Sequence, residues 1–127
     1  MSDMTRERPT KRSGATARRP DWTTDATLAE MIRRILAVGT PQKIVLFGSR
    51  ARGDARTDSD YDLLLVEHSK LPRHKRAAHY RRALTGLAGA KDILVWTPEE
   101  VAQWRDVPNA FVTEAMQTGV VLYERPL

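Results

Sequence analysis

The sequence predicts an α/β fold, because short apolar runs alternate along it with segments of helical spacing. The runs that have the length and content of buried strands are 43–47, 60–66 and 91–96. Apolar residues recur at helical spacing over 25–38, about 72–87 and 109–118. At 127 residues, the chain has the size of one domain.

The first of these helices is expected near the N-terminus. Its apolar stripe consists of Leu28, Met31, Ile32, Ile35 and Leu36. Gly39 and Pro41 end it, since both residues break helices. At its start, Thr27 and Glu30 fit a capping-box pair, and Thr24 is an equally good N-cap. We expect this helix to lie beneath the sheet.

The C-terminal part of the chain is expected to continue the alternation. The segment 97–100 is a strong helix start, with a Thr cap, a Pro at the first position and two acids at the positive end. Gly119 ends the last helix, and 120–123 adds a short strand. Trp96 and Trp104 are expected to pack against the sheet.

Residues 1–24 are expected to form a basic, disordered tail outside the domain, which spans 25–127. Residues 1–20 hold six basic and two acidic side chains, a net charge of +4, whereas the rest of the chain has fifteen basic and fourteen acidic ones. A Pro-, Thr- and Arg-rich segment with almost no apolar content is typical of disorder. It is either a solvated extension, a consequence of a start codon placed too far upstream, or a segment that contacts RNA or an acidic partner.

The composition excludes several classes of protein and site. No apolar run approaches the roughly 20 residues that span a membrane. There is no N-terminus of the secretory kind, so a cytoplasmic location is expected. Because the chain has no cysteine, disulfides, thiolate zinc sites and thiol nucleophiles are excluded.

The most informative segment lies between Leu46 and Val66. Asp60 and Asp62 are two positions apart at the start of an apolar strand, so both carboxylates project to one side. Two converging acids repel each other unless a cation lies between them, and magnesium bound through carboxylates and substrate phosphates is the usual solution. A Gly-Ser turn precedes them, and its backbone N–H groups can hold a polyphosphate. Together these are the parts of a phosphoryl or nucleotidyl transfer site.

Each residue around this turn also has a structural interpretation. Gly48 and Ser49 would hold the phosphates, but they also suit an ordinary strand-to-helix turn. Arg50 and Arg52 suit triphosphate contacts, and either is equally a solvated surface charge. Ser59 either caps the turn before the carboxylates or touches the nucleotide.

Gly48-Ser49, followed after ten residues by Asp60-Tyr61-Asp62, resembles the signature of the DNA polymerase beta-type nucleotidyltransferase superfamily. The fuller strings GSRARG and SDYDL resemble its small stand-alone members, the minimal nucleotidyltransferases. The resemblance covers about residues 28–125. It implies a polymerase beta-like fold, a small mixed sheet with helices packed on one side.

The same resemblance implies a third carboxylate on the neighbouring strand, and Asp92 is the candidate. Alone, Asp92 is also a polar residue at a strand entry. With Asp60 and Asp62 it would hold two magnesium ions, and it would orient or deprotonate the attacking hydroxyl, with ATP as co-substrate. Minimal nucleotidyltransferases are commonly the antitoxin of a pair whose toxin is a HEPN-domain ribonuclease. The acceptor would then be a tyrosine of that toxin.

A second notable segment, 68–82, is strongly basic and contains all three histidines. No acidic residue occurs between His68 and Lys91. The segment either forms a solvated helix face or holds a partner protein or RNA. Zinc binding by the histidines is not expected, because no Glu or Cys accompanies them at ligand spacing.

Four functions remain open from the sequence. The first is an active nucleotidyltransferase that acts as an antitoxin, and the second is a non-catalytic antitoxin that neutralises its partner by binding. The third is a small-molecule nucleotidyltransferase, although the aminoglycoside enzymes of that kind carry an additional domain. The fourth is a nucleic-acid-binding protein, which leaves the spacing of Gly-Ser and carboxylates unexplained. The three carboxylates favour the first.

Overall fold

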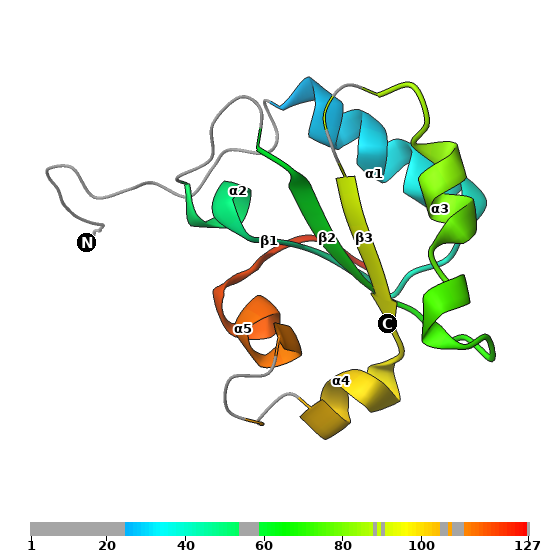
Figure 1. Ribbon diagram of the computed structural model, residues 1–127, viewed down its shortest axis with the longest axis vertical. Coiled ribbons are helices and arrows are strands. Elements are labelled where there is room, and N and C mark those ends of the chain that lie inside the picture. Colours follow the sequence, from blue (N-terminus) through cyan, green and yellow to red (C-terminus); the bar gives the residue numbers. More distant parts are fainter. Residues whose placement is uncertain are drawn as a thin grey trace, which may run out of the picture.

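The computed structural model describes residues 25–53, 59–87, 89, 91–104, 107 and 111–126. The elements, in chain order, are α1 (Ala26–Val38), β1 (Lys43–Phe47), α2 (Ser49–Arg52), β2 (Tyr61–Val66), the 3-10 helix η2 (Arg73–Lys75), α3 (Ala78–Ala83), β3 (Lys91–Trp96), α4 (Pro98–Trp104), α5 (Phe111–Thr118) and β4 (Val120–Glu124) (Figure 1). The predicted tail, 1–24, lies outside the described residues. No helix in these described stretches is long and apolar enough to cross a bilayer.

Within the described residues, the strands form a four-stranded mixed sheet in the order β3-β2-β1-β4. β1 pairs antiparallel with both β2 and β4, and β2 pairs parallel with β3. Parallel neighbours need a crossover connection, and the segment that contains η2 and α3 provides it. The predicted fold class, α/β with a small mixed sheet, is confirmed.

Helices cover both faces of the sheet, which differs from the expected packing on one side. α1 and α3 cover the face that carries Leu63 and Leu65, so α1 lies against the sheet as predicted. α4 and α5 cover the opposite face, which carries Leu64 and Val66. Because β2 is apolar at successive positions, both of its faces have to be shielded from water.

The N-cap of α1 is Asp25, whose Oδ1 accepts a hydrogen bond from the backbone N–H of Leu28 at 3.0 Å. The predicted caps differ, because Thr27 lies inside the helix and Thr24 lies outside the described residues. Asp25 also accepts a hydrogen bond from the Tyr61 hydroxyl, at 3.1 Å to Oδ2. The cap therefore ties α1 to β2, a long-range contact that no local pattern signals.

The segment predicted as one helix at about 72–87 is divided into η2 and α3. Between them, the side chain of Arg76 turns into the protein and is only 8% exposed. Its guanidinium donates to the carbonyl oxygens of Leu71 at 2.9 Å and Val95 at 3.3 Å, and to the Glu100 carboxylate at 2.7 Å. A buried guanidinium needs several acceptors. The three hydrogen bonds hold the backbone of Arg76 in place between η2 and α3, where the predicted helix is interrupted.

The predicted start of α4 is confirmed. Thr97 Oγ1 accepts from the N–H of Glu100 at 3.1 Å, and Glu100 Oε1 accepts from the N–H of Thr97 at 2.9 Å, which is a capping box. Trp96 packs against the apolar cluster beneath α4 and α5, with the Arg73 guanidinium 4.1 Å from its ring centre. Trp104 is 42% exposed, so the expectation that it packs against the sheet is wrong.

The Arg76–Glu100 pair predicts a pH dependence of stability. The hydrogen bond from Arg76 lowers the pKa of Glu100 from 4.5 to about 2, with further lowering by the Thr97 N–H and Arg73. A carboxylate whose folded pKa is depressed contributes stability above its unfolded pKa and loses it as the pH falls. We expect Glu100→Gln to reduce the decline in the free energy of unfolding between pH 4.5 and about 2, measured by urea unfolding.

Glu99→Gln is the matched control, because the Glu99 side chain is 73% exposed and lies next in the chain. It should keep the full acid-induced decline. The same decline in wild type and Glu100→Gln would show that the ion pair contributes nothing to the pH dependence.

Candidate active site

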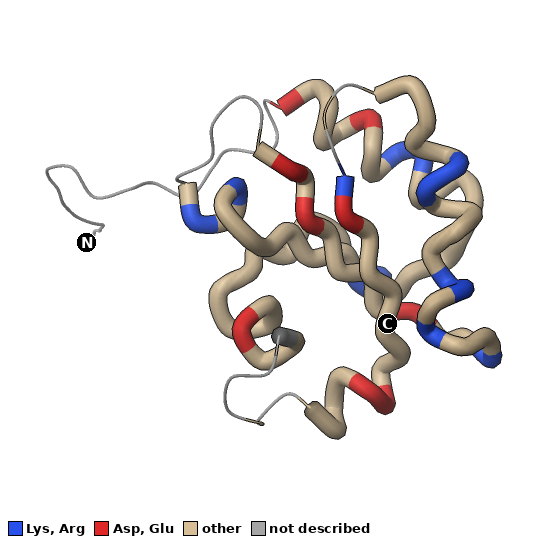
Figure 2. The backbone as a smooth tube through the Cα atoms, viewed as in Figure 1, with Lys and Arg blue, Asp and Glu red and all other residues tan. Residues whose placement is uncertain are grey.

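The predicted carboxylates come together at one end of the sheet, where β2 and β3 begin (Figure 2). The parallel register places Asp62 directly beside Asp92. Asp60 directly precedes β2. Because strand side chains alternate, Asp62 and Asp92 lie on the face covered by α4 and α5, while Tyr61 points into the core beneath α1. One end of the sheet thus brings together two acids on neighbouring strands and a third directly before β2.

The Asp62 carboxylate lies against the backbone of Gly48. The antiparallel register pairs Phe47 with Asp62, so the turn after β1 meets the first carboxylate within β2. Gly48 has a φ of 76°, and a Cβ there would lie 2.3 Å from Oδ2 of Asp62. Both the backbone angle and the contact therefore require glycine. Ser49 follows as the first residue of α2.

The electrostatics of Asp62 reflect this crowding. Burial raises its pKa above the ordinary 3.8, and the negative charges of Asp92 and Asp60 raise it further. Arg52 acts in the opposite direction. A cation between these carboxylates would relieve the repulsion that disfavours the charged form of Asp62.

The donors suit magnesium, although they do not form a complete protein site. In the part of the chain that the structure describes, no group of three His, Cys, Asp or Glu side chains is arranged to hold a metal ion. Magnesium is usually held by one or two carboxylates together with substrate phosphates and water. Asp60, Asp62 and Asp92 offer only oxygen donors, and their chemistry fits a site that the substrate completes.

Arg50 and Ser59 are in contact through the backbone carbonyl of Ser59. The Arg50 guanidinium donates to this oxygen at 3.1 Å and 2.9 Å, and it lies 3.8 Å from the centre of the Tyr61 ring. It is also 4.0 Å from Asp25, and only 16% of the Arg50 side chain is exposed. Arg50 thus braces the start of β2 against α1. The exposed Arg52 is the arginine that acts on Asp62.

A cavity of about 160 Å³ beside Gly48 was not predicted from the sequence. It lies between the turn after β1 and α5, and is lined by Phe47, Gly48, Arg52, Glu114, Ala115 and Thr118. The signal for it is weak. A Cβ on Gly119 would lie 2.5 Å from a methyl of Val45. Gly119 therefore lets the end of α5 approach β1. The position of this glycine in the sequence does not reveal which strand α5 packs against, so it does not predict the cavity.

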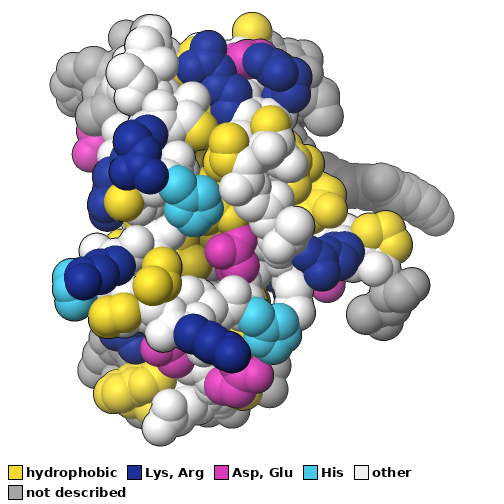
Figure 3. Space-filling view, turned by 90° about the vertical axis from the view of Figure 1, so that its right-hand side faces the viewer, with side chains coloured by type: hydrophobic (Ala, Val, Ile, Leu, Met, Phe, Trp, Pro, Cys, Tyr) yellow, Lys and Arg dark blue, Asp and Glu magenta, His cyan; other side chains and the backbone are white. Residues whose placement is uncertain are grey.

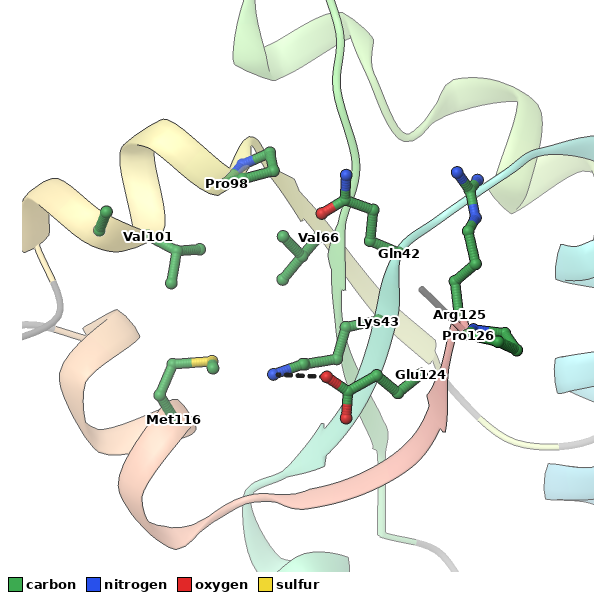
Figure 4. A pocket seen from close by; sticks show the side chains of 10 residues that line it. Gln42, Lys43, Val66, Pro98, Val101, Met116, Glu124, Arg125 and Pro126 are labelled. Atoms are coloured by element: carbon green, nitrogen blue, oxygen red, sulfur yellow. Dashed lines mark ion pairs between the residues drawn. The ribbon is translucent and has the colours of Figure 1, made fainter.

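A larger cavity, of about 440 Å³, lies at the opposite end of the same face (Figure 4). Val66, Val101 and Met116 form its apolar wall. Lys43 and Glu124 form an ion pair at 3.6 Å on its other side. None of the site residues predicted from the sequence lines this cavity, so it is separate from the carboxylates.

A mixed sheet that brings aspartates from two parallel strands against a Gly-Ser turn is an arrangement suited to phosphoryl or nucleotidyl transfer. The family model described as Polymerase beta, Nucleotidyltransferase matches residues 30–126, and the chain belongs to this family. No curated protein and no solved structure matches the chain. The family membership therefore rests on the family model, with which the fold and the site agree.

The proximity of the carboxylates predicts a coupled titration. Removing the charge of Asp92 with Asp92→Asn should lower the pKa of Asp62 toward its ordinary value, because one of the two repelling charges is gone. Carbon-detected NMR titration of the Asp62 side chain, without divalent metal, measures this shift. Glu124→Gln, which neutralises an acid at the far end of the sheet, should leave the pKa of Asp62 unchanged. Equal values in wild type and Asp92→Asn would contradict the coupling.

Proposed function

We propose that the chain is a metal-dependent nucleotidyltransferase that moves AMP, or another NMP, from an NTP to a hydroxyl group. Membership of the family indicates nucleotidyl transfer in general. The observation that carries the finer proposal is the contact between Asp62 and Gly48, with Asp92 in register beside Asp62. It joins a phosphate-binding type of turn to a set of carboxylates.

The proposed roles follow from position. Gly48 and Ser49 bind the β- and γ-phosphates through the backbone and the Ser hydroxyl, and Arg52 offsets phosphate charge. Asp60 and Asp62, with Asp92, would hold two magnesium ions. Bound there, the ions would supply positive charge that offsets the negative charge on the transferred phosphate and on the pyrophosphate leaving group.

Asp92 has a second proposed role, toward the acceptor. It is exposed at the edge of the sheet, so an acceptor hydroxyl can approach it from solvent. Its carboxylate orients that hydroxyl and accepts its proton as the oxygen attacks the α-phosphate. The new P–O bond forms as the bond to pyrophosphate breaks, so that the NMP remains on the acceptor.

The proposed acceptor is a tyrosine of a HEPN-domain toxin, and its modification would silence the toxin. This part of the proposal rests on the resemblance to minimal nucleotidyltransferases in the Gly-Ser and Asp-Tyr-Asp strings. Neutralisation by binding alone is the competing mechanism. ATP as the donor also rests on the resemblance, because the chain carries no adenine-reading motif that we can identify.

Intact-mass spectrometry tests the proposal directly. The protein is mixed with the product of its neighbouring gene, ATP and magnesium. We expect the partner to gain about 329 Da for each AMP transferred. The gain should disappear with Asp60→Asn combined with Asp62→Asn, and persist with the remote pair Glu99→Gln and Glu124→Gln. A stable complex without any gain, with every NTP and with manganese, would support neutralisation by binding alone.

Gly48→Ala separates catalysis from partner binding. The added methyl group would displace the Asp62 carboxylate, and a displacement of about 1 Å lowers rates on the order of 100-fold. We expect this loss in the rate of NMP transfer, measured by quenched-flow or time-resolved mass spectrometry, with unchanged affinity for the partner.

Gly86→Ala is the control for this experiment. Gly86 also has a positive φ, 91°, but a Cβ there meets no atom within 4 Å. This variant also places a side chain at a positive φ but adds no clash, so it should keep the transfer rate. Equal rates in Gly48→Ala and wild type would remove the contact from the mechanism.

A further inference from the structure

Basic side chains are concentrated on the side of the molecule that carries η2 and α3. Figure 3 shows this side, with Lys and Arg groups spread over it. Six of the fifteen basic residues that follow residue 20 lie within 70–82, and none of the fourteen acidic ones does. Residues 21–127 are therefore nearly neutral as a whole, but their charge is unevenly distributed.

The structure divides these six residues into two groups. Arg76 is buried and paired with Glu100, and Arg73 contacts both Glu100, at 3.2 Å, and the Trp96 ring. The other four are exposed and form no ion pair with any residue that the structure describes. These four residues, here called the basic face, are Lys70, Lys75, Arg81 and Arg82.

Two acids, one on α1 and one directly after β2, are engaged by other residues. Glu30 is bound by Arg33 and Arg34. Glu67 accepts a hydrogen bond from the buried Tyr80 hydroxyl. Arg34 also donates to the carbonyl oxygens of Ala83 and Thr85, at 3.2 Å and 3.1 Å, which adds a cation beside the end of α3. The positive charge of the face is thus not paired with any acid among the residues that the structure describes.

The side chains of the basic face fit nucleic acid better than protein. Protein interfaces use aromatic and apolar anchors at their centre. Among the large exposed apolar residues of the described chain, only Leu71 belongs to the segment 68–87. Nucleic-acid interfaces are more polar and much more positively charged. We propose that the basic face binds the phosphate backbone of a nucleic acid, independently of its sequence.

The position of the face keeps it separate from the candidate active site. α3 covers the sheet face of Leu63 and Ile93, whereas Asp62 and Asp92 lie on the opposite face. A groove of about 220 Å³ leads from Arg81 to the start of the edge strand β3 and is lined by Arg81, Leu84, Thr85, Gly86, Lys91 and Ile93. The groove ends at Lys91, which directly precedes Asp92, but the Asp92 side chain lies on the opposite face of the sheet. A strand of nucleic acid that lies along α3 and this groove is therefore on the other face of the sheet from the carboxylates.

Fluorescence anisotropy with the full chain tests the proposal. The probes are a labelled single-stranded RNA of about 30 nucleotides and the DNA of the same sequence, each titrated between about 50 and 200 mM KCl. Arg81→Gln with Arg82→Gln should weaken binding on the order of tenfold at the lowest salt. It should also lower the slope of log Kd against log salt by about 1.4, because each phosphate contact on a single strand contributes about 0.7.

Arg18→Gln with Arg19→Gln is the matched control, since it removes the same charge from an adjacent arginine pair in the basic N-terminal segment. A clearly larger loss in the Arg81/Arg82 variant, with either RNA or DNA, supports the proposal, and the stronger probe identifies the nucleic acid. Equal losses in both variants, a loss only in the control, or no binding by wild type would overturn it. Tighter binding of a polyglutamate peptide than of both nucleic acids through the same two arginines would also overturn it, in favour of an acidic protein partner.

Two further measurements keep the result interpretable. Circular dichroism and the thermal midpoint should match wild type, and Lys70→Gln with Lys75→Gln serves as a second variant of the face if they do not. NMP transfer should be unchanged in both variants, because neither pair contributes to the carboxylate site. The nucleic-acid proposal can thus fail while the proposed transfer activity holds, or the reverse.

Discussion

The contact between the Asp62 carboxylate and the backbone of Gly48 is the constraint on which the arrangement of the candidate site depends. Antiparallel pairing of β1 with β2 sets Phe47 opposite Asp62, so the turn that follows β1 has to pass over the carboxylate. Only a residue without a side chain, and with a positive φ, can do so. The same pairing fixes how far α2 and Arg52 lie from the acids.

The alternation of side chains along β2 divides structural from chemical roles. Tyr61 points to the face beneath α1, where its hydroxyl meets Asp25 and its ring lies beside Arg50. Asp62 points to the opposite face, beside Asp92. A strand that is buried on both sides holds its backbone firmly, so the carboxylates are presented from a rigid support and not from a mobile loop.

A similar division applies to the basic segment before β3. Its arginines cannot be told apart in the sequence. Arg76 is buried and bonds Glu100, which connects α4 to the segment between η2 and α3, whereas Arg81 and Arg82 are exposed to solvent. Losing Glu100 would leave the buried Arg76 guanidinium without its charged partner, which destabilises a fold strongly. The exposed ones contribute little to stability and are available for a partner. Equal residue types thus have different roles that only their surroundings distinguish.

Much of this protein was determined by its sequence. The strands at 43–47 and 91–96, the Gly-Ser turn, and the Thr97 cap of α4 follow from local patterns, and the spacing of Asp60 and Asp62 follows from the period of a strand. These features depend on residues close together in the chain. Only the tertiary structure decided that Asp25 caps α1, that helices cover both faces of the sheet and that the helix expected at about 72–87 is interrupted at Arg76. The cap and the interruption depend on partners distant in the sequence, because a carboxylate or guanidinium that leaves water takes the acceptors and donors that the folded chain brings to it. Which helices cover which face depends on the path of the chain around the sheet.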